Sequence, residues 1–177
     1  MIHRDIKPDN LFVVEVPKEQ LKVLDFGVAR VRQSQTEVSR LTQVGQVVGT
    51  PLWMAPEQVL GRDVDERADL YALATVLYTL LARRFPFEGG AMSEVVMSRL
   101  SGEAQPVGEF TFLGEPIPKK LQQVVAVCLA RDVGRRMTSA QAMVDALNEV
   151  LRGLAQPTSD EPEETPSGRW SIFKRRS

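Results

Sequence analysis

The chain has 177 residues, of which 43% are hydrophobic and 25% are charged, and its formal net charge is −1. This is the composition of a globular domain with a core, and it excludes a chain that is disordered throughout. A charge so near zero argues against nucleic acid as a partner. One cysteine and one histidine exclude an internal disulfide and are too few for a Cys/His zinc site.

The first third of the chain predicts little regular structure. Short apolar runs at residues 11–14 and 21–24 predict a small β-hairpin. Residues 28–50 are polar and show little periodicity, which predicts a long loop. Long loops inside compact domains are usually functional.

Helices are expected from residue 55 onward. The apolar run at residues 70–82 has 13 residues, fewer than the roughly 20 that a membrane span needs, so we expect a buried core helix and no transmembrane segment. Ser139 is expected to cap the last helix and Gly153 to help end it. The predicted helices are residues 55–60, 65–84, 91–100, 119–131 and 140–154.

For two of the predicted helices, the sequence also indicates which side chains are buried. In the helix at 91–100, one face gathers the apolar residues Met92, Val95, Val96 and Leu100. Cys128 lies in the apolar stretch "VVAVCLAR" and is expected to be a small buried hydrophobe rather than a reactive thiol.

The composition changes after residue 155. Residues 156–177 hold three prolines and four acidic residues followed by four basic ones, and they lack the apolar content to fold alone. We therefore expect one domain at residues 1–155 and a disordered tail. The alternative for the end of the tail, "RWSIFKRR", is contact with an anionic membrane surface. Charges in the first ten residues exclude a signal peptide there, so a cytoplasmic location is expected.

Three short motifs carry the chemistry: "HRDIKPDN" at residues 3–10, "DFG" at 25–27 and "GTPLWMAPE" at 49–57. Each is a weak signal alone, but their order and spacing are specific. On these motifs the chain resembles the protein kinase family, above all the eukaryotic-like Ser/Thr kinases of bacteria. The resemblance covers residues 2–153. It implies a mainly α fragment of an α+β fold, namely the C-terminal lobe with a small hairpin near the catalytic loop and without the N-terminal lobe.

The resemblance implies a catalytic role for four polar residues. Asp5 would accept or orient the proton of the substrate hydroxyl, and Lys7 would place an ammonium near the transferred phosphate of ATP. Asn10 and Asp25 offer the hard oxygen ligands that Mg²⁺ prefers. The alternative for all four is an ordinary polar turn.

Further residues would line the nucleotide-binding site and the substrate groove. By resemblance, Phe12 lies on the adenine side, above Val76 and Leu80, although plain core packing explains the last two equally well. Trp53 and Pro51 would shape the groove that takes a protein substrate, and Trp53 could equally be a core anchor.

The resemblance also implies an activation segment. Arg4 would bind a phosphorylated residue there, because a guanidinium matches phosphate bidentately. Thr36 and Thr42 are the expected acceptors, with Ser34 and Ser39 as alternatives. Lys7 and Thr50 resemble the residues that the Ser/Thr branch of the family, rather than the tyrosine branch, has at these places.

Five residues are expected to be structural. His3 would pack with Phe26 rather than act as a base, and Asp69 would accept backbone N–H groups of the catalytic loop. Glu57 and Arg136 would form a buried ion pair.

Several parts that hold ATP in a kinase do not occur in this sequence. It has no G-x-G-x-x-G and no V-A-I-K-like strand. We therefore expect the chain to be a Ser/Thr kinase fragment that binds ATP poorly and has no useful turnover alone. The alternative is a non-catalytic interaction module for a protein partner, such as a partner kinase or the missing lobe.

Overall fold

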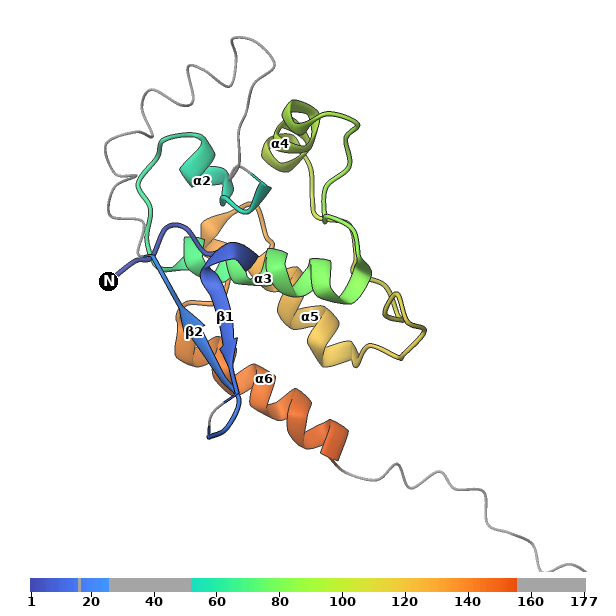
Figure 1. The fold of residues 1–177 in the computed structure, drawn as a ribbon. Coiled ribbons are helices and arrows are strands. Elements are labelled where there is room, and N and C mark those ends of the chain that lie inside the picture. Colours follow the sequence, from blue (N-terminus) through green and yellow to red (C-terminus); the bar gives the residue numbers. More distant parts are fainter. Residues whose placement is uncertain (16, 26–51, 156–177) are drawn as a thin grey trace, which may run out of the picture.

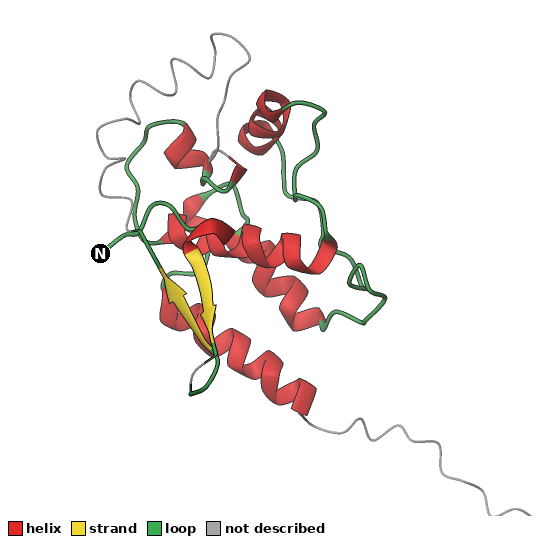
Figure 2. Cartoon of the chain, in the orientation of Figure 1, coloured by secondary structure: helices red, strands yellow, loops and turns green. Residues whose placement is uncertain are grey.

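The computed structural model describes residues 1–15, 17–25 and 52–155. This part of the chain is mainly helical and has one two-stranded antiparallel hairpin, in agreement with the predicted secondary structure (Figure 2). The predicted loop at residues 28–50 and the predicted tail both lie wholly outside the described residues. The division into one domain and a tail therefore stays a prediction.

The hairpin directly follows the catalytic-loop motif. A single turn of 3-10 helix, η1 (Pro8–Asn10), leads into strand β1 (Leu11–Val14), which pairs with β2 (Gln20–Val23). The second strand begins one residue earlier than predicted, with Leu11 opposite Val23. Almost every side chain of the hairpin is exposed, so it presents apolar groups on both faces.

Helix α3 (Arg67–Ala82) is the central element of the fold (Figure 1). It begins where the Asp65 carboxylate accepts the backbone N–H of Arg67 at 2.9 Å. It ends at Arg83, which has a left-handed φ of 55°. Pro86 follows closely and disfavours a further helical turn. The left-handed Arg83 and the nearby Pro86 thus explain why the helix ends before the predicted residue 84.

The helices α5 (Lys119–Cys128) and α6 (Ala140–Ala155) complete the core, because α5 packs against both α3 and α6. Ser139 caps α6 as predicted, with its Oγ accepting the N–H of Ala142 at 3.2 Å. The prediction for Gly153 was wrong, since α6 continues to Ala155. The cost of one helical glycine, about 1 kcal/mol, does not end a helix by itself.

Two further helices lie on the other side of α3 (Figure 1): α2 (Pro56–Val59) and α4 (Met92–Ser101). In α4 the predicted apolar face is only partly right. Val95 and Val96 are buried, but Met92 and Leu100 are only partly covered, and the charged Arg99 is fully buried. None of the helices in the described part is long and apolar enough to cross a membrane.

Candidate active site

The catalytic-loop motif is attached to the first turn of α3 through Asp69. One carboxylate oxygen accepts the backbone N–H of His3 at 2.7 Å and the other accepts that of Arg4 at 2.8 Å. This is the contact that the resemblance implied for Asp69. Arg4 has a left-handed φ of 66°, which is costly for a residue with a side chain. The two charge-assisted hydrogen bonds help to hold the loop in that conformation.

His3 is buried, and its imidazole forms hydrogen bonds with the backbone of the catalytic loop and of Leu24. Its Nδ1 accepts the backbone N–H of Asp5 at 3.3 Å, so its Nε2 carries the proton and donates to the carbonyl of Leu24 at 3.1 Å. The imidazole therefore joins the loop to the end of β2, which is a structural role. Its expected neighbour Phe26 lies outside the described residues.

Asp5, Lys7 and Asn10 meet at one point. Asp5 is 9% exposed, and its Oδ2 lies 3.3 Å from Nζ of Lys7. The side-chain amide of Asn10 donates to the Asp5 carbonyl at 2.8 Å and to Oδ2 at 3.2 Å. Because the amide nitrogen faces Asp5, the side-chain oxygen of Asn10 (Oδ1) is the atom left for a cation.

Asp25 lies two residues after the end of β2, next to Leu24. The backbone N–H of Leu24 donates to the backbone carbonyl of Asn10 at 2.9 Å, which brings the two ends of the hairpin together. Asp25 is exposed and has a left-handed φ of 53°. The oxygens of Asn10 and Asp25 fit Mg²⁺, which takes few protein ligands and completes its shell with water and phosphate. No cluster of three or more acidic, His or Cys ligands occurs in the described residues.

The residues predicted for the adenine side differ in exposure. Val76 is buried in the core, whereas Phe12 is 49% exposed and Leu80 is 66% exposed. Val76 is therefore a packing residue here. Phe12 and Leu80 offer apolar surface, and their contact with a nucleotide stays a prediction.

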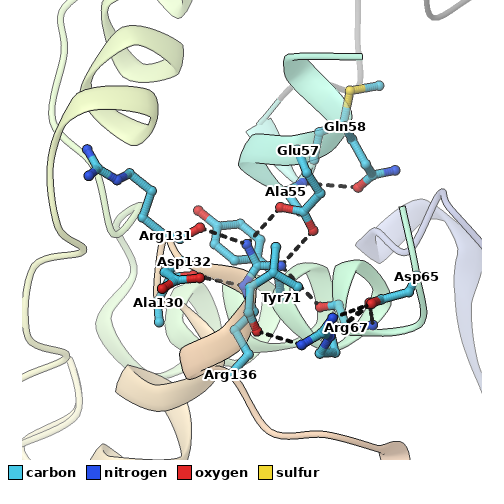
Figure 3. Close-up of polar contacts among 12 residues, drawn as sticks. Ala55, Glu57, Gln58, Asp65, Arg67, Tyr71, Ala130, Arg131, Asp132 and Arg136 are labelled. Carbon is cyan, nitrogen blue, oxygen red and sulfur yellow. Dashed lines mark hydrogen bonds and ion pairs between the residues drawn. The ribbon is translucent and has the colours of Figure 1, made fainter. Parts of the chain in front are cut away.

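Glu57 and Arg136 form a buried, bidentate ion pair (Figure 3). The Arg136 nitrogens donate to the two Glu57 oxygens at 2.7 and 2.8 Å. Arg136 also donates to the carbonyl of Ala130 at 2.8 Å, and its guanidinium lies 4.7 Å from the ring centre of Tyr71. The pair thus ties α2 to the segment before α6, as the resemblance implied.

Two contacts next to the motifs were not predicted. The Gln58 side chain accepts the N–H of Ala55 at 3.0 Å and donates to the carbonyl of Arg4 at 3.0 Å, so it joins α2 to the catalytic loop. Arg99 donates to the carbonyls of Leu52 and Met54. Long polar side chains usually face water, and nothing in the local sequence pattern marks these two as exceptions.

Two pKa shifts reflect local packing. Hydrogen bonds from Arg67 lower the pKa of Asp65. Burial raises the pKa of the Cys128 thiol to about 11, which keeps it protonated and unreactive at neutral pH. This agrees with its predicted role as a buried hydrophobe.

The remaining predictions for the activation segment, on Thr36, Thr42 and Thr50, lie outside the described residues. So does Pro51 of the predicted substrate groove. Trp53 is partly buried, and its ring centre lies 5.2 Å from that of Phe85.

The order of the motifs and the geometry around Asp5 define a protein kinase domain. The family model for the protein kinase domain matches residues 1–147, and the chain belongs to this family. The serine/threonine-protein kinase Pkn1 of Myxococcus xanthus is 38% identical over 154 residues, which are 85% of this chain and 21% of that protein.

Two further relatives widen the comparison. Serine/threonine-protein kinase PknA of Mycobacterium tuberculosis (strain H37Rv) is 30% identical over 166 residues, which are 94% of this chain and 35% of that protein. Tyrosine-protein kinase MasK of Myxococcus xanthus (strain DK1622) is 37% identical over 153 residues, which are 85% of this chain and 22% of that protein. The chain thus spans between about a fifth and a third of the length of these relatives.

Proposed function

We propose that this chain supplies the catalytic-loop half of a Ser/Thr protein kinase domain. In a protein that also holds the nucleotide, it would transfer the γ-phosphate of ATP to Ser or Thr hydroxyls, and it would be inactive by itself. The observation that carries the proposal is the convergence of Lys7 and Asn10 on Asp5, with Asp25 next in the chain to Leu24, whose N–H donates to the backbone carbonyl of Asn10. Such positioning is the main part of phosphoryl-transfer catalysis.

Each residue has a distinct task in this proposal. Asp5 orients the acceptor hydroxyl and takes its proton, with its carboxylate held by the amide of Asn10. Lys7 places positive charge beside that carboxylate, where the transferred phosphate would arrive. Magnesium held by Asn10 and Asp25 would supply the charge that neutralises the phosphates of ATP.

The class of the acceptor is the finer part of the proposal. Lys7 within "HRDIKPDN" favours Ser or Thr by resemblance, and two of the relatives above are Ser/Thr kinases by name, while MasK is a tyrosine kinase by name. Analysis of the phosphorylated amino acid in the product decides between the two classes. Phosphotyrosine as the main product would contradict the proposal on this point.

A second candidate is a non-catalytic module that binds a protein partner. It is favoured by the exposed apolar hairpin, where Val13 is 64% and Leu21 is 57% exposed. Apolar surface of this kind marks a contact site or an aggregation hazard. A cytoplasmic location accompanies both proposals and rests on the sequence alone.

A chimera tests the catalytic proposal. The part of the Pkn1 kinase domain that precedes its catalytic loop is joined before residue 1, and transfer of labelled phosphate from Mg-ATP to myelin basic protein is measured. We expect turnover, and we expect Asp5→Asn to reduce it by about 10²-fold or more, because a positioned base contributes about 10²- to 10⁴-fold. Asp9→Asn, on an exposed side chain of the same loop, is the control and leaves turnover unchanged.

Two outcomes of this experiment count against the proposal. Full activity of the Asp5→Asn chimera would show that Asp5 is not the base. A chimera that unfolds cooperatively on heating but transfers no phosphate would leave only the non-catalytic module.

A further inference from the structure

The loop that leads into α5 contains a tightly folded turn, which we call the apolar turn (residues 109–117). The backbone N–H of Ile117 donates to the carbonyl of Glu109 at 2.7 Å, and that of Thr111 donates to the carbonyl of Glu115 at 2.7 Å. Both hydrogen bonds join the two sides of the turn to each other. Paired backbone groups give the turn one defined shape.

The tip of the apolar turn presents large apolar side chains to solvent. Leu113 is 74% exposed and Phe110 is 60% exposed. The bend at the tip is sharp, because the N–H of Gly114 donates to the carbonyl of Thr111 at 2.9 Å and Gly114 has a φ of 87°. Exposed apolar groups at the tip of an ordered turn add nothing to the core and mark a contact site.

Phe112 attaches the turn to the end of α3. Its backbone N–H donates to the carbonyl of Leu81 at 3.0 Å, and the guanidinium of Arg83 lies 4.6 Å from the centre of its ring. A cation so close to an aromatic face adds to the attachment. The apolar turn therefore projects in a fixed direction from the end of the molecule at which α3 ends and α5 begins (Figure 1).

A pocket of about 410 Å³ opens between α5 and the segment that precedes the turn, and we call it the α5 pocket. Val107, Val125 and Leu129 are buried and give it an apolar floor. Gln122 lines the pocket and donates to the carbonyl of Ile117 at 2.8 Å, which ties the pocket wall to the turn. The volume lies in the range of pockets that bury a ligand.

The apolar turn and the α5 pocket form one surface. The residues that line the pocket lie directly before the turn, as Val107 does, and directly after it, as Lys119 does. A surface that carries a protrusion beside a hollow is self-complementary, because a twofold axis between them places each protrusion in the hollow of the other copy. Such a pair is closed, since both contacts are used within it.

The charges of this surface favour a second copy of the chain as the partner. Glu109 and Glu115 flank the tip of the turn, whereas Lys119 lines the pocket. In a twofold pair, the carboxylates of one turn approach the ammonium of the other copy, and opposite charges steer and orient association. The same carboxylates disfavour an anionic membrane surface, the other partner that exposed apolar side chains fit.

We propose that the chain forms a twofold dimer in which Leu113 and Phe110 of each copy enter the α5 pocket of the other. No residue of the turn or of the pocket belongs to the candidate active site. The dimer is therefore independent of the proposed catalysis.

Sedimentation velocity of the purified 177-residue chain tests the dimer, over a concentration series that reaches about 100 μM. We expect a species of twice the mass of the chain. Leu113→Glu and, separately, Ala126→Arg at an exposed position of the pocket should each raise the dissociation constant by about tenfold or more. Leu60→Glu is the control, because this exposed leucine follows α2 and lies outside the turn and the pocket.

A mixture of the two variants separates the contact from a loss of folding. In a pair of Leu113→Glu with Ala126→Arg, one contact is intact, and the other places the introduced carboxylate against the introduced guanidinium. We expect the equimolar mixture to form heterodimers at concentrations at which each variant alone is monomeric. If Leu113→Glu does not fold, Leu113→Ser takes its place, and the intact contact still drives recovery in the mixture.

Four outcomes would overturn the proposal. The first is an unchanged chain that is monomeric throughout the series, and the second is a mixture that stays monomeric. The third is association that survives in both variants, since it would belong to another surface, such as the hairpin. The fourth is a monomer that binds phosphatidylserine vesicles and loses this binding in Leu113→Glu, because the apolar turn would then be a membrane anchor.

Discussion

The polar contacts around Asp69 and Glu57 show which single residues organise this fold. Asp69 fixes two backbone N–H groups of the catalytic loop, and Glu57 neutralises Arg136 in the core. Both carboxylates were predicted from the resemblance to the family. Apolar periodicity could not have predicted them, because it does not mark a buried charge. The motifs also gave Asp5, Lys7, Asn10 and Asp25, whose roles in catalysis stay predictions.

The buried ion pair between Glu57 and Arg136 is expected to contribute strongly to the stability of the fold. Glu57→Gln should lower the free energy of unfolding by about 3–5 kcal/mol in urea denaturation, because it leaves the charge of Arg136 buried without its partner. Asp65→Asn is the control, since the Asp65–Arg67 pair is partly exposed and should contribute at most about 1 kcal/mol. Equal losses in both variants would contradict the distinction between the buried and the exposed pair.

Gln58 and Arg99 show what the sequence cannot reveal about single residues. Both are long polar side chains on short helices, and a polar side chain there is expected to face water. Their acceptors are backbone carbonyls 45 to 54 residues away in the chain. A backbone carbonyl has no sequence signature, so only the folded structure discloses such partners.

At the scale of elements, helices were predicted better than their ends. A continuous apolar run located α3, and apolar residues at helical spacing on one face located α4, because a face buried in the core requires apolar groups. The ends depend on local contacts, such as Asp65 at the start of α3 and the left-handed Arg83 at its end. The hairpin was predicted from two apolar runs, which gave its strands within one residue.

The exposed apolar side chains of the hairpin are expected to promote self-association of the chain. Val13 and Leu21 lie directly opposite each other and are both exposed, so their apolar groups stabilise no core in this structure. Val13→Thr combined with Leu21→Lys should reduce self-association of the chain in light scattering, with a change of about 0.5 kcal/mol or less in the free energy of unfolding.

Val125→Thr is the control for this change. It places a hydroxyl in the core, because Val125 is 1% exposed, and should lower the free energy of unfolding by about 1–3 kcal/mol. A comparable loss from the double variant would show that the hairpin is part of the core after all.

At the scale of the whole molecule, the chain contains the catalytic-loop motif of the kinase family without the sequence motifs that hold ATP. Asp5, Lys7 and Asn10 are joined by hydrogen bonds and an ion pair, and α3, α5 and α6 supply a core beneath them. Neither G-x-G-x-x-G nor a V-A-I-K-like strand occurs in the 177 residues. Catalysis by positioning needs both parts, so we predict a competent catalytic loop with no turnover of its own.

The most direct test of this claim is phosphate transfer by the purified 177-residue chain. The chain is incubated with labelled Mg-ATP and myelin basic protein, beside its Asp5→Asn variant. We predict no incorporation above that of the variant. Magnesium-dependent incorporation that Asp5→Asn abolishes would contradict it, because this chain would then hold ATP by itself.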